Sequence, residues 1–344
     1  MASSISSLPP RLEVVVCTYN PNLEYLQRTV DGLRKQTLSQ ELWAFMIVDN
    51  ASPTPVAASF SDWHRQGRIV KEPEPGLTQA RVCGIKNTQS ELILFVDDDN
   101  VLDPDYLENV LQLADQHPEL GAYGAGQILP EFAVEPDADC RRFTKGLALR
   151  NYKVAIWSND PEDRSNPWGA GLVVRREVAE EFVRIVTDEP IRKTLGRTGN
   201  KLNSAEDIEF AWIACSSGMA KGIFPQLKIQ HLIDAGRVDR GYLARLCEGH
   251  AFSHSLVKYI HHADIVQRAD RLNGLPNGGE WRTPTPSIFE QIKYLYAWML
   301  AKLPVCRRRF PNQARLAGYN GIRRCRRLIR DIESGRKKTQ DRQA

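Results

Sequence analysis

Short apolar runs alternate with helix-like segments over the first 120 residues. The runs RLEVVVCTYN, LWAFMIVDNAS and ILFVDDDN each lead into polar residues, and PNLEYLQRTVDGLRKQ has apolar residues at helical spacing with a proline near its start. Strands that alternate with helices indicate βαβ units. The order of elements therefore predicts an α/β fold with a mainly parallel sheet flanked by helices.

The alternation weakens further along the chain. Residues 130–170 are rich in charge, proline and asparagine, which favours long loops around a site. Helices are expected at about 175–186 and 205–217, and the chain after about residue 236 reads as mostly helical, with a Pro/Gly-rich interruption at 273–286. We expect one domain over 11–236 and a helical, basic C-terminal region over 237–344.

Composition restricts the class of protein. With 344 residues and 42% hydrophobic content the chain can bury a large core, and no apolar run reaches the roughly 18 residues of a spanning helix. The start, MASSISSLPPRLE, does not have the pattern of a signal peptide. Seven cysteines, an odd number without CxxC pairs, argue against a disulfide framework. These features predict a reduced, cytoplasmic protein.

The positive charge is concentrated at the C-terminal end. Residues 301–344 hold 14 Lys and Arg against 3 acidic residues, a balance of +11, which leaves about −7 for the rest of a chain of net charge +4. The basic residues follow an aromatic segment and include Arg307, Arg308, Arg309, Arg323, Arg324, Arg326 and Arg327. Such a stretch suits the anionic cytoplasmic face of a membrane, and a merely solvated helix face is the alternative. No nucleic-acid motif accompanies the charge, so we expect no nucleic-acid partner.

Polar side chains end three of the predicted strands. They are Thr18, Tyr19 and Asn20, then Asp49 and Asn50, then Asp97, Asp98 and Asp99. In open α/β sheets, ligands bind outside the carboxyl ends of the strands, so these groups predict a site. Neither GxGxxG after the first strand nor GxxxxGK[ST] is present, so the usual dinucleotide and P-loop fingerprints are missing.

The run of three aspartates is the least expected feature, because adjacent carboxylates repel one another. A calcium loop counted from Asp97 fails, since Leu102 stands where the invariant glycine belongs and a strand precedes the run. Acids at a helix start are the other alternative, but Asp103 before Pro104 already fills that role. We therefore predict a hard divalent cation, Mg²⁺ or Mn²⁺, near Asp97 and Asp99.

The sequence resembles family 2 glycosyltransferases with the GT-A fold over roughly residues 11–235. The resemblance is carried by six segments in the family's order: VVVCTYNPNLEYLQRTVDGLRKQ, IVDNAS, EPGLTQARVCGI, ILFVDDDN, WGAGLVVRRE and SAEDIEFAWIACSSG. It implies a Rossmann-like, mixed, mainly parallel sheet and an inverting transfer from a UDP- or GDP-linked sugar to a glycan or lipid-linked acceptor. Cell-surface polysaccharide or glycolipid biosynthesis is the implied setting.

The resemblance also implies roles for single residues. The donor nucleotide would be contacted by Thr18, Tyr19, Asn20, Asp49, Arg81, Asp97 and Asp98. The metal would be bound by Asp99, with Asp97 and His231 as further contacts. Glu74, Pro75 and Val82 depart from the asparagines that family members often have around this loop and the arginine, which leaves its donor contacts open.

Asp207 is the expected catalytic base, with Glu206 beside it. An attacking hydroxyl must lose a proton, and a positioned carboxylate typically contributes about 10²- to 10⁴-fold. Ser204 to Asp207 also matches S-x-x-[DE], a capping box, in which Asp207 would only hold a helix start. On the residues alone, capping and catalysis stand equal, and the resemblance favours catalysis.

The segment NPWGAGLVV predicts acceptor contacts. Gly169 and Gly171 would let the backbone approach a sugar, and the aromatic face of Trp168 suits its apolar side. A tight turn with one core tryptophan is the alternative. Two other functional classes also stay open, namely a nucleotidyltransferase and a non-catalytic sugar- or membrane-binding relative.

Overall fold

The structure is a computed structural model that describes residues 9–272, 295 and 310–340. The Pro/Gly-rich segment 273–286 and Arg307, Arg308 and Arg309 lie outside the described residues. The chain forms two compact units. The first comprises residues 1–133, 147–199 and 206–234, and the second comprises residues 134–146, 200–205 and 235–344.

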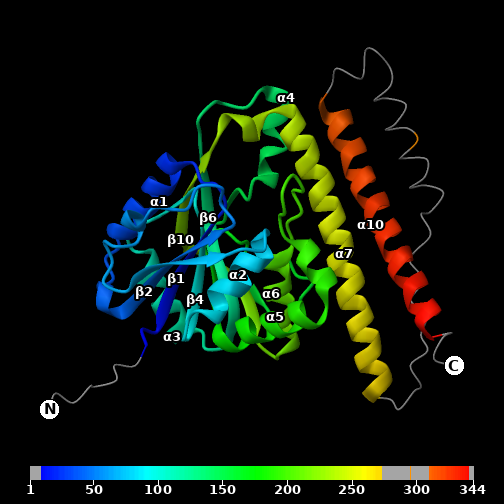
Figure 1. Ribbon diagram of the computed structural model, residues 1–344, viewed down its shortest axis with the longest axis horizontal. Coiled ribbons are helices and arrows are strands. Elements are labelled where there is room, and N and C mark those ends of the chain that lie inside the picture. The colour runs from blue at the N-terminus through cyan, green and yellow to red at the C-terminus, as the bar shows by residue number, and fades with distance from the viewer. Residues whose placement is uncertain (1–8, 273–294, 296–309, 341–344) are drawn as a thin grey trace. The chain divides into compact units, whose positions relative to one another are not determined.

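A ten-stranded sheet forms the centre of the first unit (Figure 1). Its order is β3-β2-β1-β4-β9-β6-β10-β5, with β7 paired to β6 and β8 to β10. The strands are β1 (Leu12–Thr18), β2 (Trp43–Asn50), β3 (Gly67–Glu72), β4 (Leu92–Asp97), β5 (Asn100–Leu102), β6 (Leu120–Phe132), β7 (Arg150–Asn151), β8 (Ile156–Ser158), β9 (Leu172–Arg175) and β10 (Ala220–Ile233). Neighbours among β3, β2, β1 and β4 are parallel, as are β6 and β10, and the other pairs are antiparallel. This confirms the predicted mixed, mainly parallel sheet.

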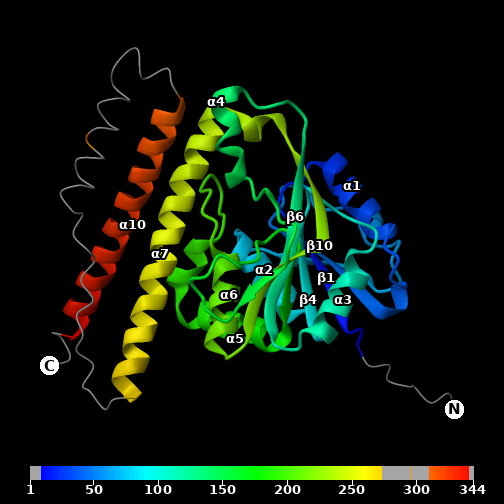
Figure 2. The ribbon, with the colours of Figure 1, turned by 180° about the vertical axis from the view of Figure 1, so that it is seen from behind.

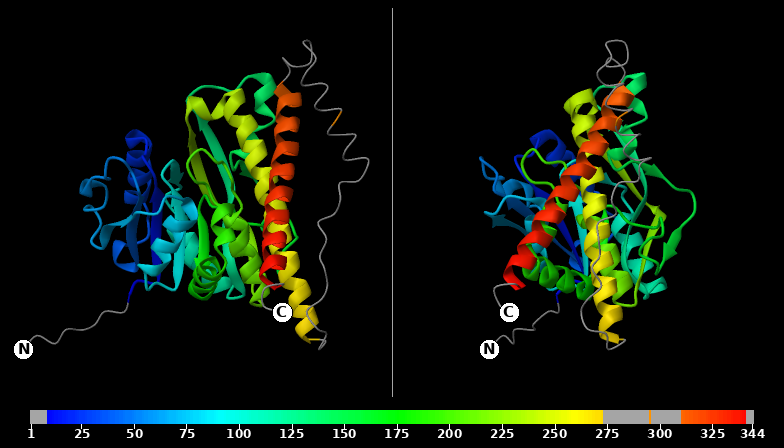
Figure 3. Two further views of the ribbon diagram at one scale, coloured as in Figure 1. Left: turned by 45° about the vertical axis from the view of Figure 1, so that its right-hand side comes forward. Right: turned by 90° about the vertical axis from the view of Figure 1, so that its right-hand side faces the viewer.

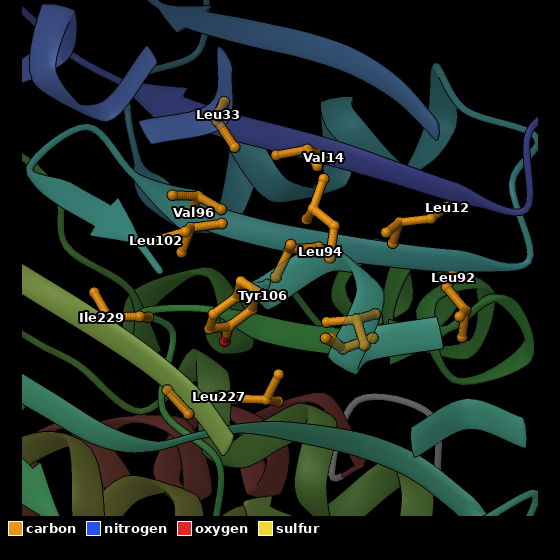
Figure 4. Close-up of a cluster of buried hydrophobic side chains, with 14 of the residues drawn as sticks. Leu12, Val14, Leu33, Leu92, Leu94, Val96, Leu102, Tyr106, Leu227 and Ile229 are labelled. Atoms are coloured by element: carbon orange, nitrogen blue, oxygen red, sulfur yellow. The ribbon is translucent and has the colours of Figure 1, made fainter. Parts of the chain in front are cut away.

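Helices cover both faces of this sheet. They are α1 (Leu23–Arg34), α2 (Leu77–Lys86), α3 (Tyr106–Gln116), α5 (Arg176–Asp188) and α6 (Glu206–Ser216), with short 3₁₀ turns η1 (Gln40–Leu42), η2 (Ala58–Phe60) and η4 (Pro190–Leu195). One face packs Leu12, Val14 and Val16 of β1 against α1 and α3 (Figure 4). The other packs Val15 and Cys17 against α2, α5 and α6. Burial on both faces explains the continuous apolar run from Val14 to Cys17 in β1.

The helices expected at 175–186 and 205–217 are α5 and α6, which lie side by side through stacked Phe182 and Phe210, 4.0 Å apart (Figure 2). Sequence patterns do not predict the two longest strands, β6 and β10. Strand β6 is rich in glycine and alanine rather than β-branched residues, and the pairing of β10 with β6 shifts register around Pro225. Both signals are weak for a strand.

The second unit is helical, in agreement with the expected C-terminal region. It contains α4 (Ala138–Arg141), η3 (Thr144–Gly146), η5 (Ala235–Val238), α7 (Arg240–Leu272) and α10 (Phe310–Gln340). Helices α7 and α10 lie side by side (Figure 3), and Gly321 packs against the backbone of Glu248. Arg324 donates to Glu248 and Asn203 at 2.9 Å each and lies over the ring of Phe252.

The basic residues of α10 divide into two groups. Arg324 is occupied in packing, whereas Arg315, Arg323, Arg327 and Arg330 are exposed. None of the described helices is both long enough and apolar enough to cross a membrane. Attachment to an anionic membrane surface stays a prediction, which co-sedimentation with vesicles would test.

Candidate active site

The polar strand ends predicted to form a site lie at one edge of the sheet. In the parallel register, Thr18 at the end of β1 pairs with Asp49 of β2, and Cys17 pairs with Asp97 of β4. Thr18, Asp49 and Asp97 therefore meet at the carboxyl edge, where open α/β sheets bind ligands.

The backbone of β4 separates the three adjacent carboxylates. Successive side chains alternate between the faces of a strand, so Asp97 shares the face of Phe95 and points toward α2. Asp98 lies on the opposite side, where Thr18 Oγ1 donates to its carboxylate and Thr29 Oγ1 of α1 donates to its carbonyl at 3.1 Å. Because β5 intervenes before α3, the aspartates do not decorate a helix start, and that alternative is wrong.

Asp99 meets His231, which the antiparallel pairing of β5 with β10 brings opposite Asn100. His231 Nε2 lies 3.4 Å from Asp99 Oδ2. Asn100 Nδ2 donates to Asp99 Oδ1 at 2.8 Å, and the Leu232 amide donates to the Asp99 carbonyl at the same distance. These bonds fix the orientation of the carboxylate toward the imidazole.

This pair fits part of a divalent cation site. A carboxylate is a suitable donor for Mg²⁺ or Mn²⁺, and an imidazole suits Mn²⁺ better than the harder Mg²⁺. Mg²⁺ commonly takes its remaining ligands from water and substrate phosphates. No group of three His, Cys, Asp or Glu side chains in the described residues is arranged as a ready ligand set. Asp99 and His231 are thus the residues that could hold the metal, and participation of Asp97 stays a prediction.

Arg81 of α2 is the buried cation on the Asp97 side. Its side chain is 1% exposed, its Nη1 lies 3.2 Å from Glu206 Oε1 as an ionic contact, and its guanidinium lies over the Phe95 ring. Burial alone would lower the pKa of Arg81, but the carboxylates of Glu206, Asp97 and Asp207 raise it. Arg81 therefore links the end of β4 to the start of α6, and its predicted contact with a nucleotide stays a prediction.

Burial, together with the crowding of charges, raises the pKa of Glu206. It is 2% exposed, and burial raises its pKa to about 7, because the nearby charge of Asp207 adds to desolvation and together they outweigh the attraction of Arg81. The Arg81 guanidinium is near three carboxylates, those of Glu206, Asp97 and Asp207. Glu206 is buried, so it keeps its proton to a higher pH than an exposed carboxyl group.

Asp207 is held by backbone amides at the start of α6. Its Oδ2 accepts from the Gly169 amide at 3.0 Å and its Oδ1 from the Ile208 amide at 2.8 Å. The Ser204 amide, which a capping box would direct to Asp207, donates to Ser253 Oγ instead. The reciprocal bond of a capping box is therefore not made, and Asp207 both accepts from a first-turn amide of α6 and anchors the 168–171 loop.

Two glycines of that loop are required by close contacts. A Cβ on Gly169 would lie 2.3 Å from Arg81 Nη2. Gly171 has φ of 70°, and a Cβ there would lie 2.2 Å from Tyr106 Oη, which donates to the Gly171 carbonyl at 2.8 Å. Close packing thus explains why both positions are glycine, and their contact with an acceptor stays a prediction.

The other residues expected to contact the nucleotide differ in accessibility. Tyr19 is 56% exposed beside Asn20, whereas Asp49 is buried and accepts from the amides of Ser52 and Val56. Asn50 holds the next loop through the carbonyls of Glu72 and Glu74 and the amide of Gly76. Asp49 and Asn50 shape the loops around the site, and a nucleotide contact of Asp49 stays a prediction.

Sequence reasoning missed Arg150. It lies in β7, within the segment predicted only to form loops, and its guanidinium is 3.3 Å from the ring centroid of Trp168. The charge of Asp207 also acts on it. No periodicity or motif marks this arginine, because its neighbours come from separate parts of the chain.

The fold and this site define the class of protein. The structure is similar to a mannosyltransferase, PcManGT from Pyrobaculum calidifontis in complex with GDP-Man and Mn²⁺, with a TM-score of 0.52 and 17% identity over 92% of this chain and 88% of that one. The fold is the GT-A fold. Residues 13–182 match the family model for glycosyl transferase family 2, and this part of the chain belongs to that family.

Curated relatives match shorter parts of the chain. The succinoglycan biosynthesis protein ExoW of Rhizobium meliloti is 30% identical over 30% of this chain and 33% of its own length. Putative glycosyltransferase EpsH of Bacillus subtilis is 26% identical over 32% of each. Glucosyl-dolichyl phosphate glucuronosyltransferase of Haloferax volcanii is 25% identical over 56% of this chain and 59% of its own length. The chain spans less than two thirds of each of these relatives.

We predict that Glu206 makes stability fall with pH. Its pKa is raised from 4.5 to about 7, so its contribution is fully present below pH 4.5 and is lost as pH rises to about 7, where the native state also releases the proton. Urea unfolding of the protein and of Glu206→Gln at several pH values should show the difference in unfolding free energy falling by about 3 kcal/mol over this range. Parallel pH profiles for the two proteins would show that Glu206 titrates normally.

Proposed function

We propose that the protein transfers a sugar from a nucleotide-diphosphate sugar to an acceptor hydroxyl with inversion, as a hexosyltransferase of cell-surface polysaccharide or glycolipid biosynthesis. The main support is that the negative charges of Asp97 and Asp207 both interact with the buried guanidinium of Arg81. A carboxylate able to accept a proton thereby stands beside the carboxyl edge of the sheet, where a donor nucleotide binds.

In this proposal, Asp207 is the general base. The Gly169 and Ile208 amides fix its carboxylate, and it is 7% exposed, against 2% for Glu206. Glu206 is the weaker candidate for the base because its carboxylate is more deeply buried and is engaged by Arg81 at 3.2 Å. A single displacement with Asp207 on the far side of the leaving group inverts the sugar carbon.

Asp99 and His231 hold the donor side. Thr18 and Tyr19 line the nucleotide pocket, and the exposed ring of Tyr19 can stack on the nucleobase. Asp99 and His231 would hold a divalent cation, which would supply positive charge to the leaving diphosphate. PcManGT, which has a similar fold, is named as a complex with GDP-Man and Mn²⁺, which agrees with a nucleotide-sugar donor and a divalent cation.

The two rival functions have less support. A nucleotidyltransferase needs a Gly-rich, basic loop after its first strand, whereas here Asn22 Oδ1 accepts from the first amides of α1. A non-catalytic relative has no need of the anchored carboxylate of Asp207 or of the Asp99–His231 pair. Release of nucleoside diphosphate from a panel of UDP- and GDP-sugars tests the proposal, and absence of release from every donor would contradict it.

We predict that nucleotide binding depends on a metal at Asp99. Affinity for UDP or GDP in Mn²⁺, measured by calorimetry, should fall at least about tenfold in EDTA and in Asp99→Asn, because a metal ligand is lost in each. Asp105→Asn is the matched control, since Asp105 is exposed and makes no side-chain cap of α3. Undiminished binding in EDTA would refute the metal site.

We predict that Asp207→Asn separates catalysis from folding. Asn retains one oxygen for the Gly169 or Ile208 amide, so stability should fall by about 1 kcal/mol, while transfer should fall by about 10²-fold or more. Initial rates with any active donor and acceptor pair and a thermal melt check both, with exposed Asp62→Asn as control. Near-normal transfer would move the base to Glu206 or away from α6.

A further inference from the structure

Three arginines of the described residues are buried, and two of them have carboxylate partners. Arg81 contacts Glu206 at 3.2 Å, and Arg192 contacts Glu209 at 2.8 Å and Glu189 at 3.0 Å. Arg150 is 9% exposed and forms no ion pair with any residue that the structure describes. Buried charges are normally paired, because an isolated one loses its hydration without compensation. Arg150 is therefore a buried cation with no carboxylate in contact with it in the described part of the chain.

The hydrogen bonds of Arg150 leave one edge of its guanidinium without a partner. Nη1 donates to the Asn166 carbonyl at 3.1 Å, whereas Nε is buried and bonds nothing, and Nη2 makes no hydrogen bond within the described residues. Nε and Nη2 form the fork that binds a carboxylate or phosphate with two parallel bonds. A buried donor left unbonded is costly, so a ligand that bonds it gains affinity.

The position of the Nε and Nη2 edge of Arg150 indicates which ligand would bind to it. The guanidinium lies on the Trp168 ring, the next residue, Gly169, bonds Asp207, and the charge of Asp207 acts on Arg150. Because the base must touch the acceptor hydroxyl, Arg150 stands on the acceptor side of the reaction. Burial lowers the pKa of Arg150 to about 9, so it is still a cation at neutral pH.

We propose that Arg150, seated on Trp168, binds an oxyanion of the acceptor close to the attacking hydroxyl, so that the acceptor class is an anionic glycan or a phosphate-linked one. This inference rests on the proposed function, since it places the acceptor by means of Asp207. It adds a residue and a charge requirement to the acceptor site, and it predicts that neutral sugars bind weakly there.

The test uses the full chain at pH 7, with UDP or GDP and Mn²⁺ present to fill the donor site. Calorimetry measures the Kd of inorganic phosphate, of methyl glucuronide and of neutral methyl glucoside. Arg150→Gln should weaken the anionic probe that binds by about tenfold or more. Arg150→Lys keeps the charge without the fork and should weaken it less. Lys153→Gln removes an exposed charge from the same loop and should change nothing.

The outcomes separate the possibilities. Preference for phosphate indicates a phosphate-linked acceptor, and preference for the glucuronide indicates an acidic sugar. Equal affinities in Arg150→Gln and Lys153→Gln, or no binding of either anion to the unmodified protein, would overturn the inference. Failure of both UDP and GDP to bind would instead contradict the proposed function, because that measurement does not involve Arg150.

Discussion

Three consecutive carboxylates must be kept apart at the end of a buried strand, and the rest of the site follows from how this is done. Alternation along β4 sends Asp97 and Asp98 to opposite faces, and the turn into β5 carries Asp99 to a third position. Each then meets a different kind of partner: a guanidinium, a hydroxyl and an imidazole. The charge density that looked unfavourable in sequence becomes three separate functional groups.

Arg81 extends this arrangement to the second half of the sheet. It comes from α2 and reaches Glu206 at the start of α6, which sets the position of Asp207. Gly169 has no side chain where the guanidinium passes, and its amide bonds Asp207. The proposed base, the acceptor loop and the strand carrying the donor side are thus connected through a single buried cation. Burial, with the charge of Asp207 added to it, raises the pKa of Glu206, because the attraction of this one cation does not offset both.

Much of the fold could be predicted from local sequence. The continuous apolar runs within β1, β2 and β4 predicted their burial on both faces, and the polar residues at the ends of these runs marked the carboxyl edge. Strands β6 and β10 could not be predicted, because they are stabilised by pairing with each other across about 100 residues of chain rather than by a local pattern. The anchoring of Asp207 depended on Gly169, and the environment of Arg150 on Trp168 and Asn166. Such tertiary contacts leave no periodic signal.

The shared cation can be measured directly with a double-mutant cycle of Arg81→Met and Glu206→Gln, with unfolding free energies determined at pH 8, where Glu206 is ionised. Removal of Arg81 alone should cost about 3–5 kcal/mol, because it leaves buried carboxylates uncompensated. Adding Glu206→Gln should recover part of that loss, which gives a coupling energy of about 1 kcal/mol or more. Free energies that add to within about 0.5 kcal/mol would contradict the account, since Arg81 and Glu206 would then act independently.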